Sequence, residues 1–297
     1  MVRRSPQTER LVEIVEYLAD RPTDGRNLAD ISRTLGADKA TLFPMLTELT
    51  RVGWVVKHPT KKTYRLGPRL APVGDSARIA VNAIAPARKP MSRLAIESGN
   101  VCCLIVPSGG DLVVAEVAHP EPDDRPLLGV RAGDKITHRP PLGSVLVAWA
   151  DDFAITAWLD RNPVVAEDSS RYRAVLDLIR NRRFAVEQYP PEPAAFRDVA
   201  VSATSIAYGS ERASRFTRGQ EERLNVEMLV GEIDDAQLYR PLSVNSPVFD
   251  RERTVVGSLC LLDVPEAITG GELRDIGHRL RDTADDITAE LGGVVPG

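Results

Sequence analysis

The 297-residue sequence predicts an α+β protein with a small helical N-terminal part and a larger C-terminal part built on an antiparallel sheet. Apolar residues recur at helical spacing up to residue 51, and the strand-like segments after residue 100 pair as hairpins. Charge divides along the same line, because residues 1–70 hold 13 basic and 8 acidic residues, whereas the remainder has a net charge of −9. A basic part suggests a polyanionic partner, although a solvated face has the same composition.

The composition excludes several classes of protein. With 43% hydrophobic residues the chain can bury a sizeable core, and no segment has the roughly 18 consecutive apolar residues of a membrane span. The basic start at residues 1–6 has no apolar run behind it, so a secretory signal is not expected. Three cysteines make no disulfide framework. We therefore expect a cytoplasmic protein with no membrane partner.

Three helices are predicted before residue 54. Each combines apolar residues at helical spacing with a capping residue before it or a glycine after it. Their expected ranges are 5–21, 27–35 and 38–53. The boundary signals are Ser5 with Pro6, Asn27 with Gly36, and Asp38 with Gly53.

A β-hairpin follows, with alternating segments at 54–58 and 63–66 joined by residues 59–62. Three helices followed by a hairpin are typical of a winged helix-turn-helix, whose third helix enters the major groove of double-stranded DNA. The hairpin would be the wing, and it has Lys61 and Lys62 at its tip. We predict a DNA-binding domain over residues 1–68. The alternative is a small helical domain used for protein contacts.

The predicted DNA contacts follow from this arrangement. On the third helix, Lys39, Thr41 and Phe43 are expected to face the major groove. On the hairpin, basic side chains are expected to contact phosphates, which fix position rather than sequence. These residues are Lys57, Lys61, Lys62 and Arg65.

A linker and a second domain complete the chain. We expect a linker helix over residues 69–90, interrupted because Pro72, Pro86 and Pro90 disfavour one continuous helix. Residues 91–297 form the second predicted domain. Its expected strands are 101–106, 112–117, 127–130, 184–187, 242–249 and 254–262, and its expected helices are 142–159, 171–182, 220–229 and one from a capping box at Thr269 to Leu291.

The sequence lacks the common catalytic and cofactor motifs, namely the phosphate-binding loop, the dinucleotide fingerprint and the nucleophile elbow. The four histidines are scattered, and none has metal-ligand spacing to a cysteine. Cys102 and Cys103 are neighbours on a predicted strand and face opposite sides, so we interpret them, and Cys260, as small residues of a sheet. We expect no metal, no cofactor and no enzyme; an enzyme in the C-terminal part is a third hypothesis.

The order of these segments resembles the IclR family of bacterial transcriptional regulators. The resemblance covers most of the chain, and each motif is short. The N-terminal matches are 28–36, 39–43, 46–55, 64–67 and 73–74, and the C-terminal matches are His138, Gly143 with Leu146-Val147-Ala148, Ser246-Pro247-Val248-Phe249-Asp250, 255–262, 268–269 and 290–293.

The resemblance implies a winged helix-turn-helix, a linker helix and a GAF-like (profilin-like) effector domain. Members of the family bind DNA as homodimers or tetramers, with dimerisation through the N-terminal region and the linker. Their effector is typically a small organic acid or an aromatic metabolite, bound over the sheet beneath the loop before Gly143. The carried-over effector-binding residues are Leu142, Gly143, Ser144, Pro247, Cys260 and Leu262.

The start of the helix after Gly143 offers a physical reason for this placement. Free backbone N–H groups at a helix N-terminus form a cradle for a carboxylate. The alternative is that Gly143 only permits close packing.

Three departures from the family pattern stand out. Pro44 replaces the recognition-helix arginine, and it lies either inside a helix that follows Asp38 or in the first turn of a helix capped by Thr41. Ser144 replaces a lysine, and residues 188–240 are longer than the usual acidic segment.

The leading hypothesis is a ligand-responsive, dimeric regulator that represses by blocking promoter access. The alternative, motivated by Pro44 and the modest basic charge, is a metabolite-binding dimeric module with weakened or lost operator binding.

Overall fold

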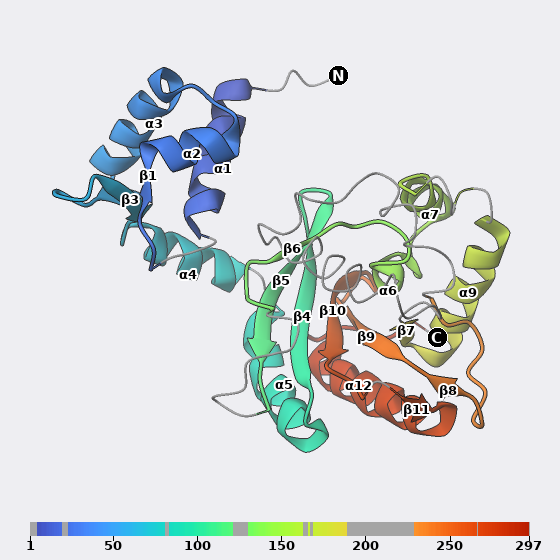
Figure 1. Cartoon of the computed structure of the whole chain (residues 1–297). Coiled ribbons are helices and arrows are strands. Elements are labelled where there is room, and N and C mark those ends of the chain that lie inside the picture. The colour runs from blue at the N-terminus through green and yellow to red at the C-terminus, as the bar shows by residue number, and fades with distance from the viewer. Residues whose placement is uncertain are drawn as a thin grey trace. The chain divides into compact units, whose positions relative to one another are not determined.

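The computed structural model describes residues 5–19, 23–80, 83–120, 130–162, 166, 169–188, 229–265 and 267–296 (Figure 1). The chain divides into two compact units, Met1–Ala80 and Val81–Gly297, and the division falls inside the segment 69–90 that the sequence predicts as a linker. Within the described ranges, no helix is long and apolar enough to cross a membrane.

The first unit contains the three predicted helices and the predicted hairpin. Asn27 caps the second helix, since its side chain accepts a hydrogen bond from the backbone N–H of Asp30 at 2.9 Å, and Gly36 ends that helix with φ 58°. The helices are α1 (Pro6–Ala19), α2 (Leu28–Leu35) and α3 (Lys39–Arg51). The strands β1 (Arg26–Asn27), β2 (Val55–Lys57) and β3 (Thr63–Leu66) form a sheet of order β1-β3-β2.

One apolar cluster holds this unit together. Full burial of a large aliphatic or aromatic side chain contributes roughly 1.5–3 kcal/mol. The buried members are Ile14, Tyr17 and Leu18 of α1, Ile31 of α2, Leu42, Leu46 and Leu49 of α3, and Val55 and Tyr64 of the hairpin. Helix α3 is therefore fixed by one face, and its opposite face is exposed.

Pro44 lies inside α3. The helix begins after Asp38, which has extended backbone geometry, so the arrangement with Thr41 as the cap is not the one found. A proline at this depth removes a backbone donor, at a cost of about 3 kcal/mol in a helix interior. The buried Leu42, Leu46 and Leu49 offset that cost by packing.

Helix α4 (Leu70–Ala80) follows the hairpin. Residues 71–77 are all exposed, and Val73 is 49% exposed.

The second unit is built on a six-stranded antiparallel sheet of order β6-β5-β4-β10-β9-β7. This confirms the α+β class and the mainly antiparallel pairing. The strands are β4 (Val101–Ser108), β5 (Asp111–Ala118), β6 (Lys135–Ile136), β7 (Ala185–Gln188), β9 (Pro241–Phe249) and β10 (Val255–Leu262), and a separate pair is β8 (Leu238–Tyr239) with β11 (Ile268–Thr269).

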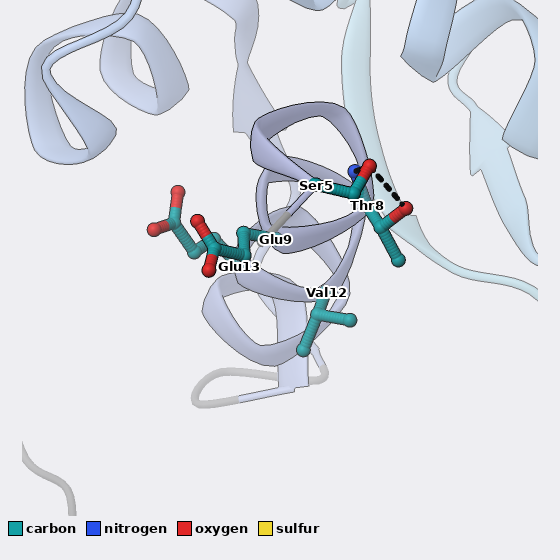
Figure 2. A pocket seen from close by; sticks show the side chains of 5 residues that line it. All are labelled: Ser5, Thr8, Glu9, Val12 and Glu13. Carbon is teal, nitrogen blue, oxygen red and sulfur yellow. Dashed lines mark hydrogen bonds between the residues drawn. The ribbon is translucent and has the colours of Figure 1, made fainter. Parts of the chain in front are cut away.

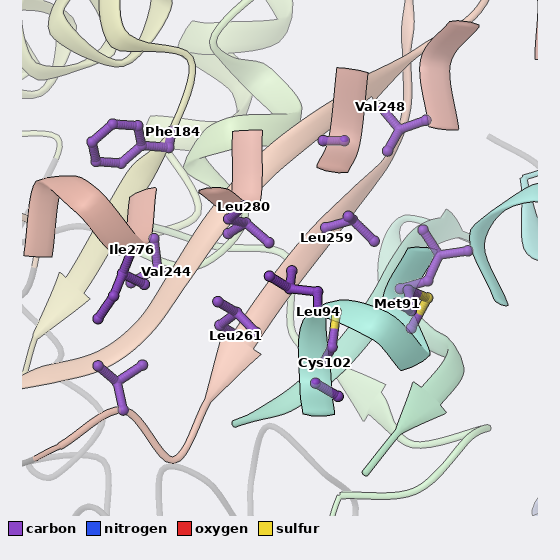
Figure 3. Close-up of a cluster of buried hydrophobic side chains, with 14 of the residues drawn as sticks. Met91, Leu94, Cys102, Phe184, Val244, Val248, Leu259, Leu261, Ile276 and Leu280 are labelled. Carbon is purple, nitrogen blue, oxygen red and sulfur yellow. The ribbon is translucent and has the colours of Figure 1, made fainter. Parts of the chain in front are cut away.

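Helices α5 (Ile84–Ser98) and α12 (Gly270–Glu290) pack against one face of this sheet. Alternation along the strands sends Val244 and Leu259 to this face, where they meet Met91 of α5 and Leu280 of α12 (Figure 3). The predicted capping box opens α12: Thr269 Oγ1 accepts from the N–H of Glu272, and the Glu272 carboxylate accepts from the N–H of Thr269.

Helix α6 (Ser144–Val147) packs against the opposite face of the sheet. Side chains of β4, β5 and β10 form a second apolar cluster on that face. Cys260 pairs in register with Cys103 on one side and with Asn245 on the other. Further helices of this unit are α7 (Asp152–Leu159) and α9 (Ser169–Arg182).

The segment 142–159 differs from its prediction. The single helix expected there is wrong, because the chain forms α6 and α7, and Asp151 caps α7 by accepting from the N–H of Ala154 at 2.8 Å. The strand expected at 127–130 and the helix expected at 220–229 lie outside the described residues except for Val130 and Leu229.

Candidate nucleic-acid interface and ligand site

The third helix exposes the three side chains predicted to face DNA. Lys39, Thr41 and Phe43 are all exposed on α3, and Phe43 is 49% exposed although it is apolar. By helical periodicity, Ala40 and Thr47 also fall on the exposed side. An exposed aromatic ring on such a helix is suited to the methyl group of thymine.

The wing exposes all four predicted basic residues, Lys57, Lys61, Lys62 and Arg65. Its backbone closes through two hydrogen bonds: the N–H of His58 donates to the carbonyl of Thr63 at 2.7 Å, and the N–H of Lys62 donates to the carbonyl of His58 at 3.1 Å. Lys62 has φ 52°, a left-handed conformation that residues other than glycine rarely adopt.

Lys57 connects the wing to the third helix. Its ammonium lies 5.7 Å from the centre of the Phe43 ring and 5.4 Å from that of Tyr64. A cation over an aromatic ring gains about 0.5–1 kcal/mol at an exposed site. Two residues predicted separately as DNA contacts therefore contact each other.

His58 has a role that the sequence interpretation missed. Its Nδ1 accepts hydrogen bonds from the backbone N–H groups of Thr60, at 3.2 Å, and Lys61, at 3.1 Å. The available signal was its place directly before a turn, where short polar side chains often accept such bonds.

In the second unit, the structure brings together most of the predicted effector residues. Leu142 packs in one apolar cluster with Cys260 and Leu262, on the sheet face away from α5 and α12. Gly143 and Ser144 follow Leu142 directly. Pro247 lies on β9, paired in register with Ser258 of β10, two residues before Cys260.

Gly143 is required at its position for two reasons. Its φ is +80°, and a Cβ there would lie 2.6 Å from Cδ2 of His138. Gly143 therefore does pack closely against His138, as the alternative interpretation of this glycine predicts. Helix α6, which follows, has only four residues, so its dipole is weak.

A buried carboxyl group, which the sequence interpretation missed, lies against the backbone of Gly143. Glu187 of β7 is 6% exposed, and its Oε2 accepts from the hydroxyl of Ser243 at 2.8 Å. The Asn245 side-chain amide donates to that same hydroxyl at 2.8 Å, and the backbone of Gly143 also hydrogen-bonds the carboxyl. Burial raises the pKa of Glu187 to about 7. The backbone donor expected to hold an effector carboxylate thus holds one from the protein.

Two further polar groups lie beside this cluster. The Ser144 side chain is 1% exposed, and its hydroxyl has no hydrogen-bond partner within the described part of the chain. Burial, together with the positive charge of Arg161, lowers the pKa of His138 to about 4, so His138 is neutral at pH 7. A buried polar atom without a partner is rare and marks a place where a bound molecule can supply one.

The cysteines and histidines form no metal site or nucleophile within the described ranges. No group of three or more possible metal ligands is found there. Burial raises the pKa of the Cys102 thiol to about 12, and it raises those of Cys103 and Cys260 well above their usual value. Thiols in this state are unreactive at neutral pH.

An open pocket on α1 contains none of the predicted site residues. Figure 2 shows its lining, Ser5, Thr8, Glu9, Val12 and Glu13, with the Thr8 hydroxyl donating to that of Ser5 at 3.0 Å. Val12 is 49% exposed there.

Comparison with known proteins finds similarity to transcriptional regulators. A family model described as the IclR helix-turn-helix domain matches residues 7–59. The chain is 22% identical over 285 residues to the HTH-type transcriptional regulator XynR of Escherichia coli (strain K12), covering 96% of each chain. It is 30% identical over 193 residues to the glycerol operon regulatory protein of Streptomyces griseus, covering 63% of this chain and 74% of the relative.

Solved structures show the same fold. An IclR transcriptional regulator from Alicyclobacillus acidocaldarius superposes with a TM-score of 0.67 at 19% identity, covering 98% of this chain and 100% of the other. An IclR homologue from Microbacterium hydrocarbonoxydans, complexed with 4-hydroxybenzoate, gives 0.63 at 15% identity, covering 96% and 99%.

Proposed function

Because the chain belongs to the IclR family of transcriptional regulators, we propose that it is an effector-controlled repressor. It is a regulator with a helix-turn-helix DNA-binding domain, and members of this family are not enzymes. The proposed organisation is a DNA-binding domain at 1–68, a linker helix at 69–90 and an effector-binding domain at 91–297. The proposed location is the cytoplasm.

DNA binding is assigned to α3 and the wing. Lys39, Thr41 and Phe43 contact the major groove, and Lys61, Lys62 and Arg65 contact phosphates. Their common exposure on one helix and one hairpin supports this assignment. Lys57 contributes charge and also joins the hairpin to Phe43.

The effector is proposed to bind over the sheet beneath the loop before Gly143, contacting Leu142, Gly143, Ser144, Pro247, Cys260 and Leu262. The observation that supports this most strongly is the buried polar cluster of Glu187, Ser243 and Asn245 beside the unpartnered hydroxyl of Ser144. The 4-hydroxybenzoate bound by a structural relative supports a small organic acid or an aromatic metabolite.

An acidic effector bound next to Glu187 would place two carboxyl groups side by side. Two adjacent carboxyl groups avoid repulsion by sharing one proton. Since the pKa of Glu187 is raised to about 7, this side chain can provide that proton near neutral pH.

Assembly into a homodimer or tetramer is proposed through α1 and α4. Val12 and Val73 are each 49% exposed on these helices, and α4 leaves residues 71–77 exposed in its own unit. Effector binding would then change the relative populations of two spacings of the DNA-binding domains through the linker.

A gel-shift assay with the upstream region of the chain's own gene tests the proposal. The proposal expects a retarded species at low salt that 4-hydroxybenzoate or a related acid dissociates. No retarded species would instead favour a metabolite-binding dimeric module without an operator. Pro44, which replaces a basic contact in α3, is the observation that favours this second candidate.

A further inference from the structure

We propose that His58 is a positioning residue for DNA binding. Its imidazole holds the turn of the wing in the shape that directs Lys61 and Lys62 toward phosphates. This inference rests on the proposed contact of the wing with DNA. It identifies His58 as the residue that fixes the conformation of the wing before DNA binds.

The backbone of the turn depends on this side chain. The hairpin's own hydrogen bonds use the N–H groups of His58 and Lys62. The N–H groups of Thr60 and Lys61 lie between them and point into the turn, where Nδ1 of His58 accepts both. The single lone pair of Nδ1 is shared by two consecutive backbone N–H groups, and the bond to Thr60, two residues on, corresponds to that of an Asx-turn.

The backbone conformation of Lys62 is a second, independent observation that the tip of the wing is conformationally constrained. At φ 52° a glycine would relieve strain, because glycine adopts this conformation without cost. A lysine here keeps a positive charge at the tip in spite of that strain. Strained conformations persist where surrounding contacts impose them, and they cluster at functional sites. The carbonyl of His58, which accepts from the N–H of Lys62 at 3.1 Å, is one such contact.

The base of the wing is held separately from its tip. The ammonium of Lys57, adjacent to His58, lies over the rings of Phe43 and Tyr64. The base is thus connected to α3, while His58 fixes the tip. A hairpin held at both ends keeps Lys61 and Lys62 at a set distance from the helix that enters the groove, so less entropy is lost on binding.

The test uses the full chain and a mixed-sequence DNA duplex of two helical turns, with binding followed by fluorescence anisotropy over a range of salt. The key variants are His58→Ala, which removes the acceptor, and His58→Asn, which restores an oxygen acceptor at similar reach. Thr60→Ala is the matched control, because it keeps the backbone N–H that His58 binds. Lys89→Ala removes one exposed charge from the other unit.

We expect His58→Ala to weaken binding by roughly three- to tenfold, the value of one or two ordinary hydrogen bonds. His58→Asn should recover most of that loss, and both controls should bind within twofold of the wild type. The salt slope of His58→Ala should stay within half a unit of the wild type, since its charges are unchanged. Equal binding by wild type and His58→Ala, or a His58→Asn variant as weak as His58→Ala, would overturn the proposal.

Amide hydrogen exchange supplies a readout that does not depend on DNA. The N–H groups of Thr60 and Lys61 should exchange faster in His58→Ala and return toward the wild-type rate in His58→Asn. Unchanged exchange in His58→Ala would contradict the assigned geometry even if binding were weakened.

A double variant separates this inference from the proposed wing contact. Lys61→Ala with Lys62→Ala should lower the salt slope by about two units, near 0.9 for each phosphate that the protein no longer neutralises. An unchanged slope would remove the wing contact itself. A lowered slope together with unaffected His58→Ala binding would leave the wing contact intact and remove only the role of His58.

Discussion

The two units of the chain hold their functional chemistry in opposite ways. In the first unit the groups proposed to bind DNA include exposed cations on a helix and a hairpin, placed by backbone geometry within a few residues. In the second unit they are buried polar groups brought together from β7, β9 and the loop before α6. Variants of the first unit should therefore change binding and leave folding intact, whereas variants of the second should change stability and its dependence on pH.

Gly143→Ala should have the largest effect. Left-handed backbone geometry in a residue with a Cβ and the 2.6 Å approach to His138 should together destabilise the second unit by roughly 2–4 kcal/mol. Urea unfolding followed by tryptophan fluorescence, to which the buried Trp158 of that unit contributes, measures this.

Gly109→Ala is the matched control for that variant. Its φ is +61°, but nothing lies within 4 Å of an added Cβ, so only the backbone strain of about 1–2 kcal/mol is expected. Equal destabilisation by the two substitutions would show that contact with His138 contributes nothing.

Glu187→Gln should change how stability depends on pH. The pKa of Glu187 rises from 4.5 to about 7 on folding, so the unfolded chain ionises first as the pH increases. The contribution of Glu187 to stability should fall between pH 4.5 and 7 by about 3 kcal/mol and then level off, because each unit of pKa shift corresponds to about 1.36 kcal/mol.

The glutamine variant should lack this contribution. His138 acts in the opposite direction, since its pKa is lowered from 6.5 to about 4 and its contribution disappears as the pH drops through this range. Both proteins share His138, so it cancels in the difference between their stability curves. Parallel curves for wild type and Glu187→Gln, from urea unfolding at several pH values, would contradict the buried carboxyl assignment.

Lys62→Gly should have the smallest effect on stability and the opposite sign. Removing a side chain from a left-handed position should stabilise the first unit by up to about 1 kcal/mol, while one phosphate is no longer neutralised and the salt slope falls by about 0.9. Thermal unfolding and anisotropy on the same sample measure both. A variant that is less stable, or that binds DNA as well as the wild type, would show that Lys62 is not held in strain for its charge.

The same contrast decides what could be predicted from the sequence. The helices and the hairpin of the first unit follow from caps, breakers and apolar spacing, which are local; Asn27 and Gly36 have the predicted roles. The sequence leaves the start of α3 open, because Asp38 and Thr41 are both capping residues; in the structure the carbonyl of Asp38 accepts the first helical hydrogen bonds, from the N–H groups of Thr41 and Leu42.

The site in the second unit is harder to predict from the sequence, for a physical reason. The Glu187 carboxyl and the Ser243 hydroxyl are 56 positions apart, and neither has a local pattern that predicts the other. The predicted residues Leu142, Cys260 and Leu262 do share a cluster, but resemblance to a family suggested them, not periodicity. Likewise, the break between α6 and α7 depends on Asp151, a cap within an apolar stretch whose spacing alone predicts one helix.

The ratio of affinities for two DNA duplexes tests the central claim most directly. The full chain is titrated, at one near-physiological salt concentration, with a duplex from its own upstream region and with a mixed-sequence duplex of equal length. A sequence-specific regulator should bind the upstream duplex at least about 10³-fold more tightly. Equal affinity for the two duplexes would contradict sequence-specific regulation. It would show that the helix-turn-helix, with Pro44 in α3, has no operator in the upstream region.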